Sequence, residues 1–185
     1  MKTTRIMKKG AFLILILSLG LASCQETNYP NLEKGVYAEF NTNKGVFVAK
    51  LYHEETPLTV ANFVELAKKG YYDGLTFHRV LPDFVIQGGC PNSRPGAAGM
   101  PGTGGPGYQI DCELDGELQH HDRGVLSMAH AGRNTGGSQF FVCHSRNNTA
   151  HLDRNHTCFG KVNEGLDVLD DIRQGDEIIG IEIQA

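Results

Sequence analysis

From Gly35 onward, apolar and polar residues alternate with a period of two, which is the pattern of half-buried β-strands. The alternation runs through 36–41, breaks at the turn residues Asn43-Lys44-Gly45, and resumes through 46–52, which predicts a β-hairpin. It returns at the C-terminus, where three isoleucines are spaced by two from Ile179 to Ile183. Further strand candidates are 76–81, 84–87, 124–129, 139–143 and 157–162.

Two segments have helical spacing instead. The first follows Thr56, a potential N-cap, begins at Pro57 and ends before Gly70. The second spans 166–172 and ends before Gly175. Many short strands with two amphipathic helices predict a closed antiparallel β-barrel whose helices cover its open ends. Because no internal repeat or second apolar unit is present, we expect one domain over 35–185, and we expect it to be a monomer.

The first 23 residues have the parts of a secretory signal: Lys2, Arg5, Lys8 and Lys9, an apolar run from Phe12 to Leu21, and small residues before Cys24. Leu-Ala-Ser-Cys resembles the lipobox of bacterial lipoprotein signals. This resemblance implies cleavage before Cys24, lipidation of Cys24 and anchoring to a lipid bilayer. The alternative is an ordinary cleaved signal in which Cys24 is incidental.

Residues 24–34 are polar and read as a short tether between anchor and domain. We therefore expect the protein in the bacterial cell envelope. By analogy with lipoproteins, Gln25 after the cysteine favours the outer membrane, facing the periplasm. Removing the leader takes away four positive charges and shifts the formal net charge from −4 to −8. An acidic domain without a Lys/Arg cluster argues against nucleic acid as a partner.

Four cysteines follow Cys24, at positions 90, 112, 143 and 158, with no C-x-x-C spacing. Cys143 and Cys158 lie in strand-like runs, which favours free buried thiols, whereas pairing of the other two stays open. Neither these cysteines nor His151 and His156 have a metal-ligand spacing, so we expect no metal site. A Cys143 nucleophile is an alternative that no visible cation supports.

The residues best suited to binding or catalysis lie in two segments, 77–89 (FHRVLPDFVIQGG) and 127–141 (SMAHAGRNTGGSQFF). Both place a few directed polar side chains among aromatic and aliphatic ones, which is how shallow apolar pockets are built. Arg79 cannot act as a base, but its guanidinium can aim a rigid fork of donors at a lone pair. The simpler alternative is that Arg79 pairs with Asp83. The glycines of 102–107 fit G-x-G-x-x-G without the strand-to-helix context of a dinucleotide site.

Together the motifs FHR, P-x-F-x-x-QGG, GTGG, LSMA, AG-x-N-T, GSQFF and FGKV resemble those of cyclophilins, from about Val36 to Ile183. The resemblance implies a mostly β, eight-stranded closed barrel capped by two helices. It also implies peptidyl-prolyl cis-trans isomerase activity on proline-containing polypeptides. Such catalysis requires no cofactor, metal or covalent intermediate.

The resemblance also implies roles for individual residues. Arg79 is the catalytic donor, and Gln87 steadies both Arg79 and the substrate backbone. The proline ring is held by Phe84, Val85, Phe141 and Leu152, with His156 lining the same pocket. Ala129, His130 and Gln139 line the groove for neighbouring substrate residues. His151 stands where the family often has Trp, which implies weak cyclosporin binding with catalysis kept.

Two other functions are compatible with the same residues. One is a proline-peptide-binding module or holdase chaperone whose isomerase activity is incidental; the other is an envelope scaffold that holds one proline-containing partner. We favour an isomerase acting on envelope proteins during folding, because a module that only binds has no need of Arg79.

Overall fold

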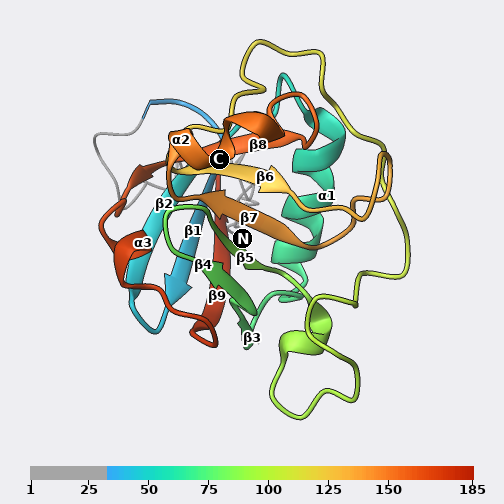
Figure 1. Ribbon diagram of the computed structural model, residues 1–185, viewed down its shortest axis with the longest axis vertical. Coiled ribbons are helices and arrows are strands. Elements are labelled where there is room, and N and C mark those ends of the chain that lie inside the picture. Colours follow the sequence, from blue (N-terminus) through green and yellow to red (C-terminus); the bar gives the residue numbers. More distant parts are fainter. Residues whose placement is uncertain (1–32) are drawn as a thin grey trace, which may run out of the picture. The chain divides into compact units, whose positions relative to one another are not determined.

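The alternating segments form one antiparallel sheet of nine strands that curls around an apolar interior (Figure 1). The structure is a computed structural model that describes residues 33–185; the predicted leader, Cys24 and the tether as far as residue 32 lie outside the described residues. The strands are β1 (Tyr37–Thr42), β2 (Gly45–Leu51), β3 (Leu75–Thr76), β4 (Arg79–Leu81), β5 (Val85–Gly88), β6 (Val125–Met128), β7 (Phe140–Cys143), β8 (Cys158–Glu164) and β9 (Glu177–Gln184). Their order across the sheet is β3-β9-β1-β2-β8-β6-β7-β5-β4.

The prediction of a closed, eight-stranded barrel is wrong. The segment predicted as one strand over 76–81 is divided into β3 and β4, which lie at opposite edges of the sheet. Between them Phe77 is buried, and its backbone N–H donates to Asp176 O at 2.8 Å instead of continuing either ladder. Within residues 33–185 no strand pairing joins β4 to β3, so the sheet curls without closing.

The predicted hairpin is confirmed: β1 and β2 pair from Tyr37↔Lys50 to Thr42↔Gly45. The predicted first helix is α1 (Pro57–Lys68), which lies beside the sheet in Figure 1 and buries Val60, Phe63 and Leu66 against it. Its N-terminus differs from the prediction, because the Thr56 side chain makes no cap bond. The Glu113 carboxylate accepts instead from the N–H groups of residues 58 and 59, at 3.0 and 2.8 Å.

The second predicted helix is much shorter than expected. Only one turn forms, α3 (Val168–Asp171), and Ile172 is already extended. A helical turn that periodicity did not indicate, α2 (Arg146–Thr149), is followed by the 3₁₀ turn η2 (Ala150–Leu152). The long connection between β5 and β6 contains one 3₁₀ turn, η1 (Pro91–Ser93). No helix within residues 33–185 combines the length and apolar character needed to cross a membrane.

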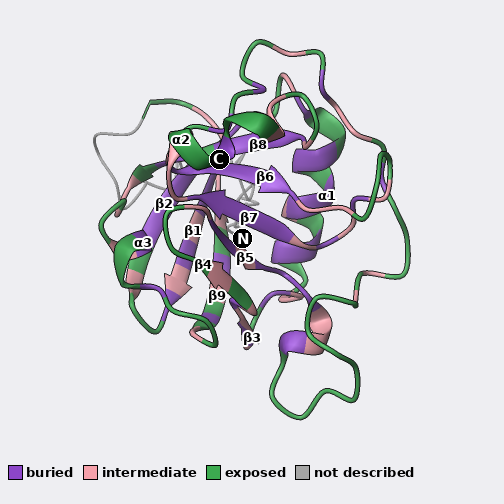
Figure 2. Ribbon diagram, in the orientation of Figure 1, coloured by how far each residue is buried: buried purple, intermediate pink, exposed green. Residues whose placement is uncertain are grey.

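Side chains from β5 to β8 alternate between two apolar clusters. Most of these strands are coloured as buried in Figure 2. The larger one, the main core, fills the inside of the curled sheet and is built around mutually packed aromatic rings. Phe63 of α1 lies against Phe40, Tyr72, Phe140 and Phe159, with ring centroids 5.2–6.0 Å apart. The smaller one, the second cluster, consists of Val85, Val125, Phe141, Cys143 and Cys158 on the other face.

Candidate functional site

The second cluster and the side chains packed against it include most of the predicted proline-binding residues. Val85 and Phe141 are buried within it, while Phe84, Ala129 and Leu152 pack against it and remain partly exposed. Strand register explains this grouping, because Val85 is opposite Cys143 and Gln87 is opposite Phe141 on the paired strands β5 and β7. Alternate residues such as Ile86 point into the main core instead.

Arg79 lies at the rim of the second cluster, opposite Gln87 in the β4–β5 ladder. Its Nη1 donates to Gln87 Oε1 at 3.3 Å, and its guanidinium carbon lies 5.8 Å from the centroid of the Phe84 ring. Within residues 33–185 no ion pair involves Arg79, so the alternative pairing with Asp83 is not observed. An exposed guanidinium held at one nitrogen keeps its other donors free for a ligand.

A chain of side-chain amides extends from Arg79 into a neighbouring groove. Gln87 Nε2 donates to Gln139 Oε1 at 3.1 Å, and Gln139 Nε2 donates to the carbonyl oxygens of Gly102 and Gly104 at 2.9 and 2.8 Å. These bonds fix both glutamine side chains against the glycine-rich loop. The amide of Gln87 is therefore oriented before any ligand arrives.

The groove has a volume of about 740 Å³. Four predicted site residues line it, together with the loop 102–109 and residues 131, 135, 137 and 138; the four are Gln87, Ala129, His130 and Gln139. Its lining combines glycine and alanine with polar side chains such as Gln87, Thr135 and Gln139, and no Asp, Glu, Lys or Arg is among the described residues that line it. Such a surface suits an extended polypeptide that hydrogen-bonds through its own backbone.

Three predicted histidines border the site. The His130 and His156 rings are stacked, with centroids 4.0 Å apart, and His156 meets the Phe141 ring edge-on at 5.5 Å. Burial, followed by the neighbouring His130 ring, lowers the pKa of His156, so the His156 ring is neutral at pH 7. The exposed His151 ring is stacked on Phe84 at 5.8 Å.

The tight turn that carries Phe84 has its own polar support. Asp83 adopts a left-handed conformation (φ 61°), and its N–H donates to His144 Nδ1 at 2.9 Å. The His144 N–H donates in turn to Phe84 O at 2.8 Å. Sequence reasoning did not assign His144 to this role, because the two segments are about 60 residues apart and nothing in the local pattern links them.

The alternative of a Cys143 nucleophile is not supported by the surroundings of this thiol. Each of the four cysteines within residues 33–185 is unpaired, so a bond between Cys90 and Cys112 is not present. Burial raises the pKa of the Cys143 thiol to about 12, which leaves no thiolate at neutral pH. No group of three or more potential metal ligands comes together among the described residues.

Comparison with known proteins gives consistent matches. The family model described as "Cyclophilin type peptidyl-prolyl cis-trans isomerase/CLD" matches residues 37–180. A peptidyl-prolyl cis-trans isomerase of Helicobacter pylori (strain ATCC 700392 / 26695) is 51% identical over 155 residues, covering 83% of this chain and 90% of the relative. Peptidyl-prolyl cis-trans isomerase B of Bacillus subtilis (strain 168) is 48% identical over 159 residues, covering 86% and 99%.

Among solved structures, the fold is similar to that of a cyclophilin-type peptidyl-prolyl cis-trans isomerase of Cryptosporidium parvum. The crystal structure of that protein in the presence of the dipeptide Ala-Pro superposes with a TM-score of 0.71 at 31% identity. The match covers 80% of this chain and 99% of the other.

Proposed function

The chain belongs to the family of cyclophilin-type peptidyl-prolyl cis-trans isomerases, and from this premise we propose that Arg79 is its catalytic group and that it acts in the bacterial cell envelope. As a peptidyl-prolyl isomerase it accelerates rotation about X–Pro bonds. The mechanism, the binding residues and the location are the parts proposed here.

The chemical problem is the resonance of the imide bond. Rotation faces a barrier of about 18–20 kcal/mol, which corresponds to roughly 10–100 s per uncatalysed event. At the twisted transition state the prolyl nitrogen becomes pyramidal and regains a lone pair. A donor aimed at that nitrogen stabilises the twisted state more than either planar isomer, so it lowers the barrier.

Arg79 suits this role because its guanidinium is a fixed cationic donor that never deprotonates in proteins. The observation that carries the proposal is its single anchor: Nη1 donates to Gln87 Oε1 at 3.3 Å, and the guanidinium makes no other hydrogen bond within residues 33–185. Donors held in place but left free are what transition-state stabilisation requires.

Beside the guanidinium, the surface of the second cluster would receive the pyrrolidine ring. Phe84, Val85, Phe141 and Leu152 would contact it, with the edge of His156 closing one side. The presence of Ala-Pro in the crystal structure of the C. parvum relative supports a proline-containing substrate. Substrate residues next to the proline would lie in the groove that Ala129, His130 and Gln139 line.

The location rests on the leader alone. Lipidation of Cys24 would tether the domain to a membrane, with the outer membrane favoured, and its clients would be envelope proteins during folding. Mass spectrometry of the intact protein from bacterial membranes tests this. We expect an acylated N-terminal cysteine that is lost in Cys24→Ala; a mature N-terminus at another residue with an unmodified Cys24 would contradict the proposal.

Isomerisation of a tetrapeptide containing Ala-Pro tests the catalytic assignment. We expect Arg79→Ala to lower kcat/KM by about 10²–10³-fold, the usual effect of removing one preorganised donor. The matched control is Arg173→Ala, since Arg173 is also exposed and, within residues 33–185, its guanidinium donates only to the carbonyl oxygens of Asp170 and Ile172. Equal rates for wild type and Arg79→Ala would instead favour a proline-binding module or holdase chaperone.

A further inference from the structure

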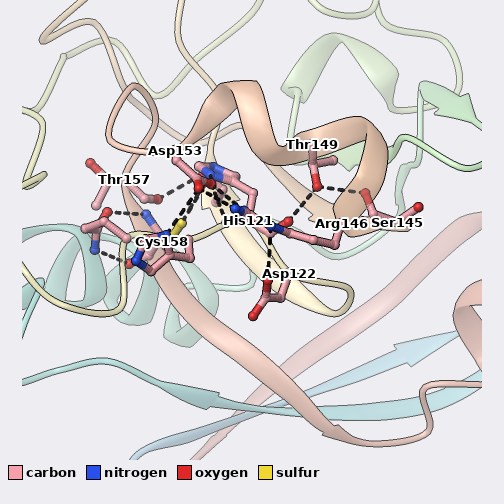
Figure 3. Close-up of polar contacts among 11 residues, drawn as sticks. His121, Asp122, Ser145, Arg146, Thr149, Asp153, Thr157 and Cys158 are labelled. Carbon is pink, nitrogen blue, oxygen red and sulfur yellow. Dashed lines mark hydrogen bonds and ion pairs between the residues drawn. The ribbon is translucent and has the colours of Figure 1, made fainter.

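Directly beneath the proposed proline pocket lies a polar network that the proposed catalytic mechanism does not use (Figure 3); it is fully buried at His121 and partly exposed at Asp153 and Arg146. It joins His121, in the loop before β6, to Asp153, which directly follows Leu152 of the pocket, and to Arg146 at the start of α2. The His121 side chain has no exposed surface. A buried polar network with a specific partner for each group fixes the geometry of whatever packs on it.

The Asp153 carboxylate is the centre of this network. Arg146 donates to it with both terminal nitrogens, Nη1 to Oδ1 and Nη2 to Oδ2, each at 2.7 Å. The His121 backbone N–H donates to Oδ1 at 2.8 Å, and the Nδ1 atoms of His120 and His121 lie 3.2 Å from the carboxylate. The Arg146 guanidinium lowers the pKa of Asp153 well below its usual range, so the carboxylate is ionised at every working pH.

This carboxylate determines the tautomer of His121. Because an ionised carboxylate only accepts, His121 Nδ1 carries the proton and donates to Oδ1. Burial lowers the pKa of His121 to about 4, so the ring is neutral. Its Nε2 lies 2.9 Å from Ser127 Oγ and competes with Thr157 O, at 3.2 Å, for the single Ser127 hydroxyl proton. Ser127 is fully buried, which leaves the Asp153–His121–Ser127 series with a positioning role rather than a reactive one.

The His121 ring in turn supports two walls of the proline pocket. It is stacked on Phe141, with centroids 5.8 Å apart and an interplanar angle of 16°, and it meets His156 edge-on at 6.4 Å. The third wall, Leu152, directly precedes Asp153 in the chain, and Leu152 O accepts from the N–H groups of Asn155 and His156 at 3.0 and 3.2 Å. The anchored Asp153 carboxylate is therefore linked to residues 141 and 156 through the His121 ring and to residue 152 through the backbone.

We propose that Asp153, held by Arg146 and acting through His121, is a positioning residue that sets the shape of the proline pocket. This inference rests on the proposed function, because it takes Phe141, Leu152 and His156 as the walls that hold the pyrrolidine ring. The pocket holds the pyrrolidine ring in both planar isomers and in the twisted state. Displaced walls therefore weaken the binding of all three states about equally. Loss of the network therefore raises KM and leaves kcat unchanged.

The test compares kcat and KM for an Ala-Pro tetrapeptide in the wild-type protein, Asp153→Asn and Arg146→Gln. Asp153→Asn keeps the shape of the side chain but loses acceptor capacity, and Arg146→Gln is the milder variant because Arg146 is 41% exposed. We expect each variant to raise KM at least about five-fold while kcat stays within about two-fold of the wild-type value. The double variant should show no further rise in KM, because both substitutions disrupt the same network. The Phe141 and His156 ring resonances should shift as well.

A variant in the main core controls for lost stability, and Ile181 on β9 supplies it. Of Ile181→Val and Ile181→Ala, the control is the one whose Tm is closer to that of the network variants. It should change neither KM nor the ring resonances. An unchanged KM in both network variants, or a rise no larger than in the control, would overturn the inference. Phe141→Ala distinguishes failure of this inference from failure of the proposed proline pocket. If Phe141→Ala raises KM and the network variants do not, only the positioning role of Asp153 is rejected. If Phe141→Ala leaves KM unchanged, the proposed pocket itself is rejected.

Discussion

The main core and the second cluster share the strands β5–β8, yet different forces hold them. Phe140 and Phe141 are neighbours on β7 and show the contrast. Phe140 packs against Phe40, Phe63 and Tyr72 inside the curled sheet, with centroids 5.6–5.8 Å apart. Phe141 faces outward and lies on the ring of a buried histidine. The core is stabilised mainly by apolar packing, whereas the site is an apolar surface positioned by polar groups from loops.

The largest expected difference between the two regions is in stability. Phe140→Ala should lower the free energy of unfolding by about 3–5 kcal/mol, because it leaves a cavity among packed rings. Phe141→Ala should cost less, since one face of that ring borders the pocket, but it should raise KM. Urea denaturation and steady-state kinetics on both variants check this. Equal losses of stability would mean that the two clusters form one cooperative core.

The pH dependence of stability also distinguishes the second cluster from the main core. The histidine that lies on Phe141, His121, is buried in its neutral form. His121 has a pKa lowered from 6.5 to about 4 by burial, so between these values the unfolded chain binds a proton that the folded protein does not. Stability therefore falls as the pH drops from 6.5 to 4, by roughly 2–3 kcal/mol for this group.

Urea denaturation at pH 7 and pH 4.5 measures the effect. His121→Gln should lose less stability over this interval than the wild type, whatever its stability at pH 7. A substitution in the main core, Ile181→Val, should leave the pH dependence as in the wild type. The same pH dependence in His121→Gln as in the wild type would show that this ring is not held neutral.

The smallest expected effect concerns Glu113, a loop residue that caps α1, the helix packed against the main core. Glu113 caps α1 from outside the helix, so Glu113→Gln should lower the free energy of unfolding by about 1 kcal/mol without changing kcat/KM. Glu65→Gln on the same helix, which loses only an exposed ion pair with Lys69, should cost less than about 0.5 kcal/mol. Equal costs would mean that Glu113 acts only as a surface charge.

This contrast also explains which features the sequence could predict. Period two located the hairpin and the later strands, because alternation decides which face a side chain joins. It could not show that 76–81 would divide into β3 and β4, since both pieces have the same strand character. The prediction of a closed barrel failed at that point.

The polar support of the site was equally out of reach from the sequence. Glu113, His144 and the Arg146–Asp153 pair act across loops that have no periodicity, and their partners are set by the tertiary fold. The histidines at 120 and 121 were visible as a pair, yet nothing local distinguishes the buried one from its exposed neighbour. The motifs carrying Arg79, Phe84 and Gln87 needed no such information, because family resemblance identified them directly.

The most direct test of the account separates kcat from KM for Arg79, by NMR exchange measurements on an Ala-Pro peptide from low to saturating concentrations. If the guanidinium stabilises only the twisted imide, Arg79→Ala lowers kcat by about 10²-fold or more and leaves KM within a few-fold of the wild type. A wild-type kcat in Arg79→Ala, with any change confined to KM, would contradict the account and make Arg79 a binding residue.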